Sequence, residues 1–414
     1  MKKLLVIPVV ILLLALGVIA AACGSSSSGG TSSSSSPSAA AQTTPIKVGH
    51  IIDLTGAEAV VGKEMKTSLA YAFQSVGNQI DGRPVQIIVA DGGGSAATAI
   101  QDAKQMVEVD HVAAIFGPTE ISEKIAVANY CKQVGVPMLT YDPTPPFVFQ
   151  GNKYVFGVGG TTVQPTSCMG DYLYKHLGYK TIDTLAEAGS AGHAFVDPLV
   201  AEFEKDGGKV VQQLWPTPDI NDYSSYLTTL KPANCVVAWV TGSSAITLLT
   251  QYHQLGIDKK MPIAGAFHGG FLDPFIPAAM SPANAASVIG DMAPMGYAPD
   301  STTPENQAFV AGFTKAMGFP PGDDGASGPY QAAMVFIQAV KDTNGNTDSS
   351  VLTPAIAATK IVGPQGPTSF AAGQQAATMD EYILKVAKVP GVKNAYHYVT
   401  VYTYQNVSPN GYGQ

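Results

Sequence analysis

Short apolar segments alternate with helical segments from residue 46 onward, and this alternation restricts the fold more than any other feature. The segments between the apolar runs repeat their apolar residues at helical spacing. The predicted strands are Ile46–Ile52, Val85–Ala90, His111–Phe116, Val136–Thr140, Thr181–Leu185, Val210–Gln213, Cys235–Val240, Met261–Gly265 and Tyr396–Tyr404. The predicted helices are Gly62–Val76, Ala96–Val109, Ser122–Gln133, Pro165–Leu177, Asp197–Asp206, Ser224–Leu230, Ala245–Gln254, Pro304–Met317 and Tyr330–Lys341. A repeating β-turn-α unit predicts an α/β fold, with parallel strands in a sheet that helices cover on both faces.

The strand–helix series begins a second time near residue 165, which suggests two lobes of similar plan. The 414 residues of the chain exceed one average domain and suit two. In parallel α/β folds, ligands bind outside the carboxyl ends of the strands. We therefore expect a ligand site in a cleft between the lobes. The stretch 267–303, rich in Ala, Pro and Met, gives no clear element.

The N-terminus has the composition of an export signal. Lys2 and Lys3 precede the apolar run Leu4–Ala22, which small residues close before Cys23. The run is long enough to span a membrane, so a retained transmembrane anchor is the alternative. The order of residues resembles a bacterial lipoprotein signal, which implies that Cys23 is lipidated and anchors the protein to the membrane. Residues 24–44 are rich in Ser, and we expect them to form a disordered tether.

Charge and composition exclude several partners. The net charge is −8, charged residues make up 13% of the chain, and Arg83 is its one arginine. Without a basic patch, the chain is not expected to bind nucleic acid. Export permits a disulfide, but Cys131, Cys168 and Cys235 fall in elements that lie at different ends of the predicted layers. Because a disulfide needs close Cα atoms, we favour buried thiols.

The sequence carries no recognisable catalytic or metal motif. The histidines are scattered, and HExxH, CxxC and GxSxG motifs are absent. The glycine-rich turn 91–95 lacks the lysine of a phosphate loop. We therefore expect neither enzymatic activity, nor a cofactor, nor a metal. The alternatives are a ligand-sensing receptor component and a cleft hydrolase built on His193 and His268, for which the sequence offers no nucleophile.

Several local strings, in this order and spacing, resemble type I periplasmic binding proteins, namely the branched-chain amino-acid-binding family of ABC importers. The strings are IKVGHIIDLTG (46–56), IDGRPVQIIVAD (80–91), HVAAIFGPTEIS (111–122), GVPMLTYDPT (135–144) and GPQGPTSF (363–370). The resemblance implies two Rossmann-like lobes joined by a three-strand hinge. It assigns residues 45–161 plus 295–396 to lobe 1, and 162–294 plus 397–414 to lobe 2.

The same resemblance implies the function and the partners. Members of the family close about the hinge on a small-molecule ligand and deliver it to an ABC permease in the membrane. We therefore expect an extracytoplasmic, lipid-anchored, monomeric substrate-binding protein for an amino acid or a related small polar or aromatic compound.

The resemblance places ligand residues on two turns of lobe 1. In the turn from Gly117 to Ser122, backbone N–H groups at the start of a helix would hold a carboxylate, with Thr119, Glu120 and Ser122 beside it. The alternative for Ser122 is a helix N-cap. In the next turn, Asp142 would receive a cation or an amide donor and Thr144 would supply a hydroxyl. The alternative for Asp142 is initiation of the turn before Pro143.

In lobe 2 the resemblance implies a contact from the loop Gly189–Phe195 and from the ends of later strands. The residues expected to touch the ligand there or near the hinge are His193, Phe195, Trp239, Thr241, His268 and Tyr330. Loop polarity for His193 and core packing for Trp239 are the alternatives. Two acids that relatives use for the ligand ammonium are absent, since Thr162 replaces one and the Ala266–Gly270 loop lacks the other. The ligand is therefore predicted not to be restricted to branched-chain amino acids.

Overall fold

The computed structural model describes residues 44–414 except 57, 219, 241, 268–285, 287 and 389–395. All of the described residues belong to one compact unit. Cys23 and the apolar run Leu4–Ala22 lie outside the described residues. Within the described part of the chain, the structure contains no helix with the length and apolar character needed to cross a membrane.

The first sheet has six strands in the order β2-β3-β1-β4-β5-β6. Their bounds are Gln79–Ile80 (β2), Arg83–Asp91 (β3), Ile46–Ile52 (β1), Ile115–Phe116 (β4), Met138–Thr140 (β5) and Val155–Gly157 (β6). All neighbours pair in parallel except β2, which is antiparallel to β3. The carboxyl ends of β1, β3, β4 and β5 therefore meet at one edge of the sheet.

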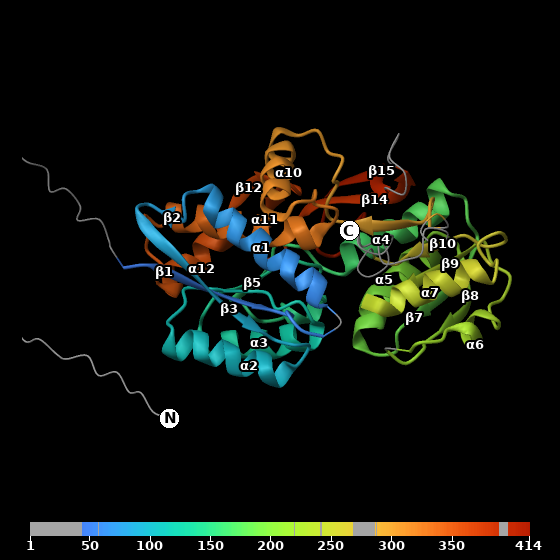
Figure 1. Cartoon of the computed structure of the whole chain (residues 1–414), viewed down its shortest axis with the longest axis horizontal. Coiled ribbons are helices and arrows are strands. Elements are labelled where there is room, and N and C mark those ends of the chain that lie inside the picture. The colour runs from blue at the N-terminus through green and yellow to red at the C-terminus, as the bar shows by residue number, and fades with distance from the viewer. Residues whose placement is uncertain are drawn as a thin grey trace, which may run out of the picture. The chain divides into compact units, whose positions relative to one another are not determined.

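Helices cover both faces of this sheet (Figure 1). On one face lie α1 (Ala59–Ser75), α11 (Asp324–Asp342) and α12 (Ser349–Ala358). On the other face lie α2 (Ala96–Lys104) and α3 (Ile121–Val134). A π-helical turn, Gln105–Val109, continues α2, and a 3-10 turn, Pro146–Val148, follows β5. Each face has its own buried apolar cluster.

The second sheet has seven strands in the order β15-β14-β11-β10-β9-β7-β8. Their bounds are Tyr396–Val407 (β15), Met379–Lys388 (β14), Met292–Met295 (β11), Ile263–Gly265 (β10), Cys235–Trp239 (β9), Thr181–Ala186 (β7) and Lys209–Leu214 (β8). Strands β7, β8, β9, β10 and β11 pair in parallel, whereas β14 and β15 add an antiparallel edge. The sheet is therefore mixed.

Two buried clusters cover the faces of the second sheet. One contains residues of α4 (Val163–Asp171) and α5 (Ser190–Lys205), and the other contains residues of α7 (Gly242–Gln254) and α10 (Pro304–Met317). The remaining elements are the short helix α6 (Ser224–Leu227), a π-helical turn (Tyr172–His176) after α4, and the hairpin β12 (Lys360–Gly363) and β13 (Gly366–Ser369).

The predicted α/β fold with two parallel-sheet lobes is confirmed. Two local predictions were wrong. Gly189–Phe195 is not a loop, because α5 begins at Ser190. Tyr330 does not begin its helix, because the Asp323 side chain caps α11 earlier by accepting from the Ala326 N–H. Strand β14 had no predicted counterpart. It pairs with β11 and β15 in the second sheet.

The expectation of buried thiols is confirmed for the described cysteines. Cys131, Cys168 and Cys235 are free and buried. Burial raises the pKa of each of these thiols above its ordinary value, so they remain protonated at neutral pH. The three residues therefore act as small apolar side chains in the core.

Candidate functional site

The turn between β4 and α3 lies at the carboxyl edge of the first sheet. Gly117 has φ +82°, and a Cβ there would stand 2.3 Å from the Ile51 carbonyl oxygen, so the turn requires glycine. Helix α3 begins at Ile121 after Glu120, and no side chain caps it. Ser122 is not the N-cap, because it is the second residue of α3. Its side chain is exposed. The first N–H groups of the helix thus have no partner within α3.

A buried ion pair joins this helix to the next turn of the sheet. The Lys124 ammonium lies 2.6 Å from an Asp142 carboxylate oxygen, and the two side chains are 1% and 17% exposed. Asp142, predicted to receive a ligand cation, therefore already holds a cation of the protein. Thr144 is buried, and its hydroxyl donates within the same turn, at 3.0 Å from Thr140 Oγ1 and 3.1 Å from the Asp142 carbonyl.

Sequence reasoning did not predict the ion pair between Lys124 and Asp142. A signal was available, because a lysine in the first turns of a helix opposes the helix dipole unless an acid compensates it. Its partner Asp142, in the turn after β5, was not predictable from helical spacing alone.

A pair of buried carboxyl groups lies on another side of the same turn. Asp53 follows β1, and its Oδ1 accepts the Gly94 N–H at 2.8 Å. Glu123, in the first turn of α3, is fully buried. Burial, and then the negative charges of Asp53 and Glu120, raise the pKa of Glu123 to about 8. Burial also raises the pKa of Asp53. At neutral pH the Glu123 carboxyl is therefore largely protonated.

Three aromatic rings are stacked at the carboxyl edge of the second sheet. Phe195 of α5 lies between Trp239, the last residue of β9, and Phe267, which follows β10. The ring centroids are 5.0 Å and 5.1 Å apart, with interplanar angles of 14° and 20°. We call these three residues the aromatic stack. Ile121 of α3 belongs to the same buried cluster, so this cluster connects the two lobes. Phe267 was not predicted from the sequence as a ligand residue.

The other predicted residues have protein partners or lie outside the described chain. His193 stacks on Trp215 at 4.0 Å, and its Nδ1 lies 3.1 Å from Asp197. Tyr330 packs between Tyr71 and Phe309, at centroid distances of 5.5 Å and 4.9 Å. Thr119 Oγ1 lies 3.5 Å from the Met65 sulfur. Thr241 and His268 lie outside the described residues.

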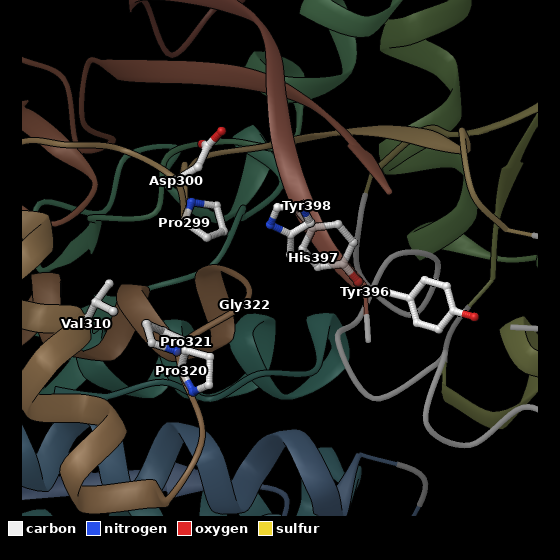
Figure 2. A pocket seen from close by; sticks show the side chains of 9 residues that line it. All are labelled: Pro299, Asp300, Val310, Pro320, Pro321, Gly322, Tyr396, His397 and Tyr398. Atoms are coloured by element: carbon white, nitrogen blue, oxygen red, sulfur yellow. The ribbon is translucent and has the colours of Figure 1, made fainter. Parts of the chain in front are cut away.

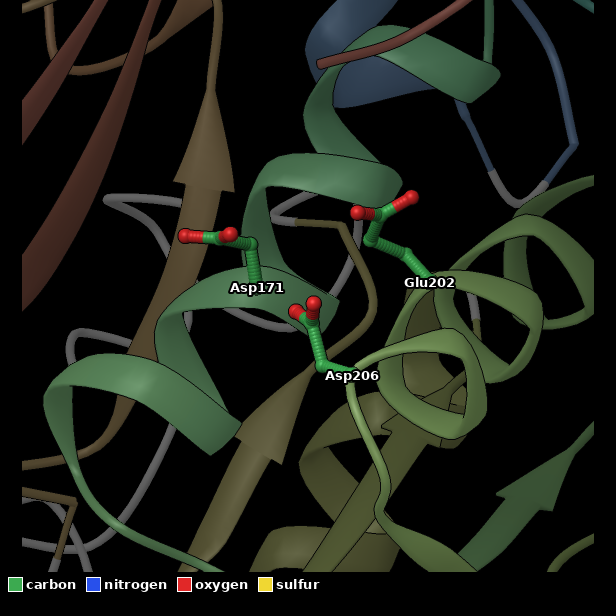
Figure 3. Close-up of side chains that lie close together, drawn as sticks. All are labelled: Asp171, Glu202 and Asp206. Atoms are coloured by element: carbon green, nitrogen blue, oxygen red, sulfur yellow. The ribbon is translucent and has the colours of Figure 1, made fainter. Parts of the chain in front are cut away.

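A group of acids with metal-ligand spacing lies elsewhere, where α5 ends beside α4 (Figure 3). It consists of Asp171, Glu202 and Asp206. The Lys175 ammonium lies 2.5 Å from Asp171 and 2.9 Å from Asp206, and Lys205 pairs with Glu202 at 3.0 Å. Because lysine ammonium groups already bridge these carboxylates, the group is an ion-pair network.

A cavity of about 260 Å³ opens beside α10, and its described lining includes none of the predicted ligand residues (Figure 2). Prolines and tyrosines form much of its wall. Its lining residues are Pro299, Asp300, Val310, Pro320, Pro321, Gly322, Tyr396, His397 and Tyr398. Both Asp300 oxygens accept from Thr400, at 2.6 Å from its hydroxyl and 2.9 Å from its N–H, so this carboxylate stabilises β15.

Comparison with known proteins agrees with the fold. A family model described as periplasmic binding protein matches residues 45–391. Leu/Ile/Val-binding protein homolog 6 of Brucella melitensis is 23% identical over 353 residues, which cover 83% of this chain and 88% of the relative.

Solved structures superpose over most of both chains. An ABC transporter solute-binding protein of Rhodopseudomonas palustris, in complex with 3,4-dihydroxybenzoic acid, has a TM-score of 0.80 at 22% identity, covering 88% of this chain and 98% of its own. An ABC transporter substrate-binding protein of Sphaerobacter thermophilus has a TM-score of 0.80 at 26% identity, covering 87% and 98%. A leucine-binding protein of Thermotoga maritima has a TM-score of 0.75 at 20% identity, covering 87% and 99%.

The two α/β lobes and the matching family model together place this chain in the class of two-lobed solute-binding proteins. The chain belongs to the type I periplasmic binding proteins, in the branched-chain amino-acid family of ABC transporters. The family consists of transport proteins and not of enzymes, and membership implies an extracytoplasmic location.

Proposed function

We propose that this protein is the lipid-anchored binding component of an ABC importer, and that it captures a small aromatic carboxylate between its lobes. The observation that carries the proposal is the aromatic stack. It lies at the carboxyl edge of the second sheet, where α/β folds bind ligands, and it shares a cluster with Ile121 of the first lobe. Flat rings provide a large apolar contact area for another flat ring.

Charge supports an aromatic acid over an amino acid. A buried ligand ammonium needs an acceptor, because an unpaired buried charge is strongly unfavourable. Asp142 was the candidate acceptor, and it is bound by Lys124. The carboxylate of the ligand would meet the uncapped N–H groups at the start of α3. Relatives of this fold are solved with 3,4-dihydroxybenzoic acid and with benzoate, which agrees with this choice.

Capture would follow from closure of the two lobes about the segments that join them. In the closed state, Thr119, Glu120, Ser122 and Thr144 would lie on one side of the ligand. Phe195 and Trp239 would lie on the other. The ligand would stabilise this state through contacts that the open state lacks.

Membrane attachment would come from Cys23. Mass spectrometry of the mature N-terminus tests this part of the proposal. A lipid-modified Cys23 as the first residue supports it, whereas an intact Leu4–Ala22 segment in the mature protein would mean a transmembrane anchor instead.

Thermal unfolding of the purified protein tests the solute class. The panel would contain benzoate, 4-hydroxybenzoate, isoleucine, a sugar and a nucleoside. A ligand at a hundred times its Kd adds about 2.7 kcal/mol of stability, which corresponds to a shift of a few degrees. A shift with the aromatic acids alone, with the compound recovered unchanged, is the expected result. A shift with isoleucine alone would refute the proposed solute class.

A further inference from the structure

The Lys124 side chain is a buried cation with unused hydrogen-bonding capacity. It is 1% exposed. A lysine ammonium has three N–H donors. Across the described part of the chain, Asp142 is the single hydrogen-bond acceptor of this ammonium, at 2.6 Å. Because buried charged donors are normally satisfied, the remaining donors indicate a position for an acceptor supplied from outside the protein.

The position of Lys124 on α3 directs it toward the proposed ligand. Lys124 follows Ile121 by three residues, and residues at that spacing lie on the same face of a helix. Ile121 belongs to the cluster of Phe195 and Trp239. Asp142, which holds the ammonium, is in the turn after β5, at the carboxyl edge of the first sheet. The ion pair thus lies at the edge of the first lobe that also contacts the cluster of the aromatic stack.

The nearby acids do not supply the missing acceptor. Glu123 is the neighbour of Lys124 in the chain, but its carboxyl lies beside Gly92, where an added Cβ would be 2.6 Å from Glu123 Oε1. Among the described acids, only Asp142 forms an ion pair with Lys124. The Lys124 and Glu123 side chains therefore leave α3 toward different turns of the sheet.

We propose that Lys124 is a specificity-determining residue, whose ammonium donates to a carboxylate oxygen of the ligand while Asp142 holds it in place. This inference rests on the proposed function and adds to it the group that recognises the ligand charge. The same ion pair disfavours a ligand α-ammonium, because that group would face a cation and would find Asp142 bound to Lys124. The ligand ring would then lie toward the aromatic stack and its carboxylate toward Lys124.

Calorimetric titration of the full chain with benzoate and with benzamide tests this proposal, since the two probes share a ring and differ in charge. The main variant is the double substitution Lys124→Met and Asp142→Asn, which removes both charges and leaves no unpaired buried ion. Loss of a charge-assisted hydrogen bond predicts that benzoate affinity falls about tenfold to a hundredfold. Benzamide affinity should change less than about threefold. The single variant Asp142→Asn keeps the ammonium and exchanges its charged acceptor for a neutral one, so it should retain more benzoate affinity than the double variant.

The outcomes separate this inference from the function on which it rests. Equal weakening of both probes in the double variant would mean that the ion pair is only structural, and would overturn the proposal. Unchanged benzoate affinity in the double variant, or an Asp142→Asn variant that loses as much benzoate affinity as the double variant, would overturn it as well. Wild-type protein that binds neither probe refutes the proposed function, and this inference with it. A cooperative thermal unfolding transition in each protein confirms that each variant is folded.

Discussion

Glu123→Gln should change how the stability of the protein depends on pH. Burial and neighbouring charges raise the pKa of Glu123 from 4.5 to about 8 in the folded state. Between these values the folded protein binds a proton that the unfolded chain has lost, so stability falls as the pH rises toward 8. One pKa unit corresponds to 1.36 kcal/mol, so the wild type should lose about 2–3 kcal/mol between about pH 5.5 and pH 7.5. Glutamine is neutral throughout and removes this loss.

Urea unfolding at several pH values measures the effect. Since the glutamine side chain has nearly the shape of the protonated glutamate and carries no charge, the variant should be folded and should gain stability over the wild type as the pH rises toward 7.5. Glu204→Gln, on the exposed face of α5, is the matched control and should follow the wild-type curve. Parallel pH profiles for wild type and Glu123→Gln would refute the interpretation of Glu123 as a buried, protonated acid.

Three further changes test particular contacts. Gly92→Ala places a Cβ 2.6 Å from Glu123 Oε1 and should cost about 1–3 kcal/mol in urea unfolding; a neutral result would contradict this packing. Gln164→Ala removes side-chain hydrogen bonds to the Thr161 N–H and to the Ala377 and Val407 carbonyls. This buried loss should cost about 3 kcal/mol, and a change below about 1 kcal/mol would mean that water replaces the bonds. Phe195→Leu should cost less than about 1.5 kcal/mol of stability but weaken 4-hydroxybenzoate binding in calorimetry, whereas unchanged affinity would exclude the aromatic stack from the site.

Most strands and helices were predictable because their apolar periodicity is local. Ile46–Ile52 and Pro304–Met317 were predicted with their observed bounds. The predicted strand His111–Phe116 is reduced to Ile115–Phe116, since the pairing of β4 with β1 and β5 is limited to these two residues. Strand β14 alternates buried and partly buried residues over much of its length, so a sequence signal existed, but its partners β11 and β15 are far away in the chain.

The candidate site was less predictable than the fold, because its side chains meet through tertiary contacts. Turn positions such as Gly117 and Asp142 follow from strand ends and could be located in advance. The pairing of Lys124 with Asp142 depends on how α3 lies beside the β5 turn, which helical spacing does not specify. Likewise, Phe195 was expected in a loop, and its place between Trp239 and Phe267 depends on α5 beginning at Ser190.

Calorimetric titration of the wild-type protein with 4-hydroxybenzoate and with isoleucine, side by side, tests the central claim most directly. The proposed function predicts saturable one-site binding of 4-hydroxybenzoate at micromolar or lower concentration, and no detectable heat with isoleucine. Tight binding of isoleucine, with none of the aromatic acid, would contradict it and would indicate an amino-acid site whose ammonium acceptor is not Asp142.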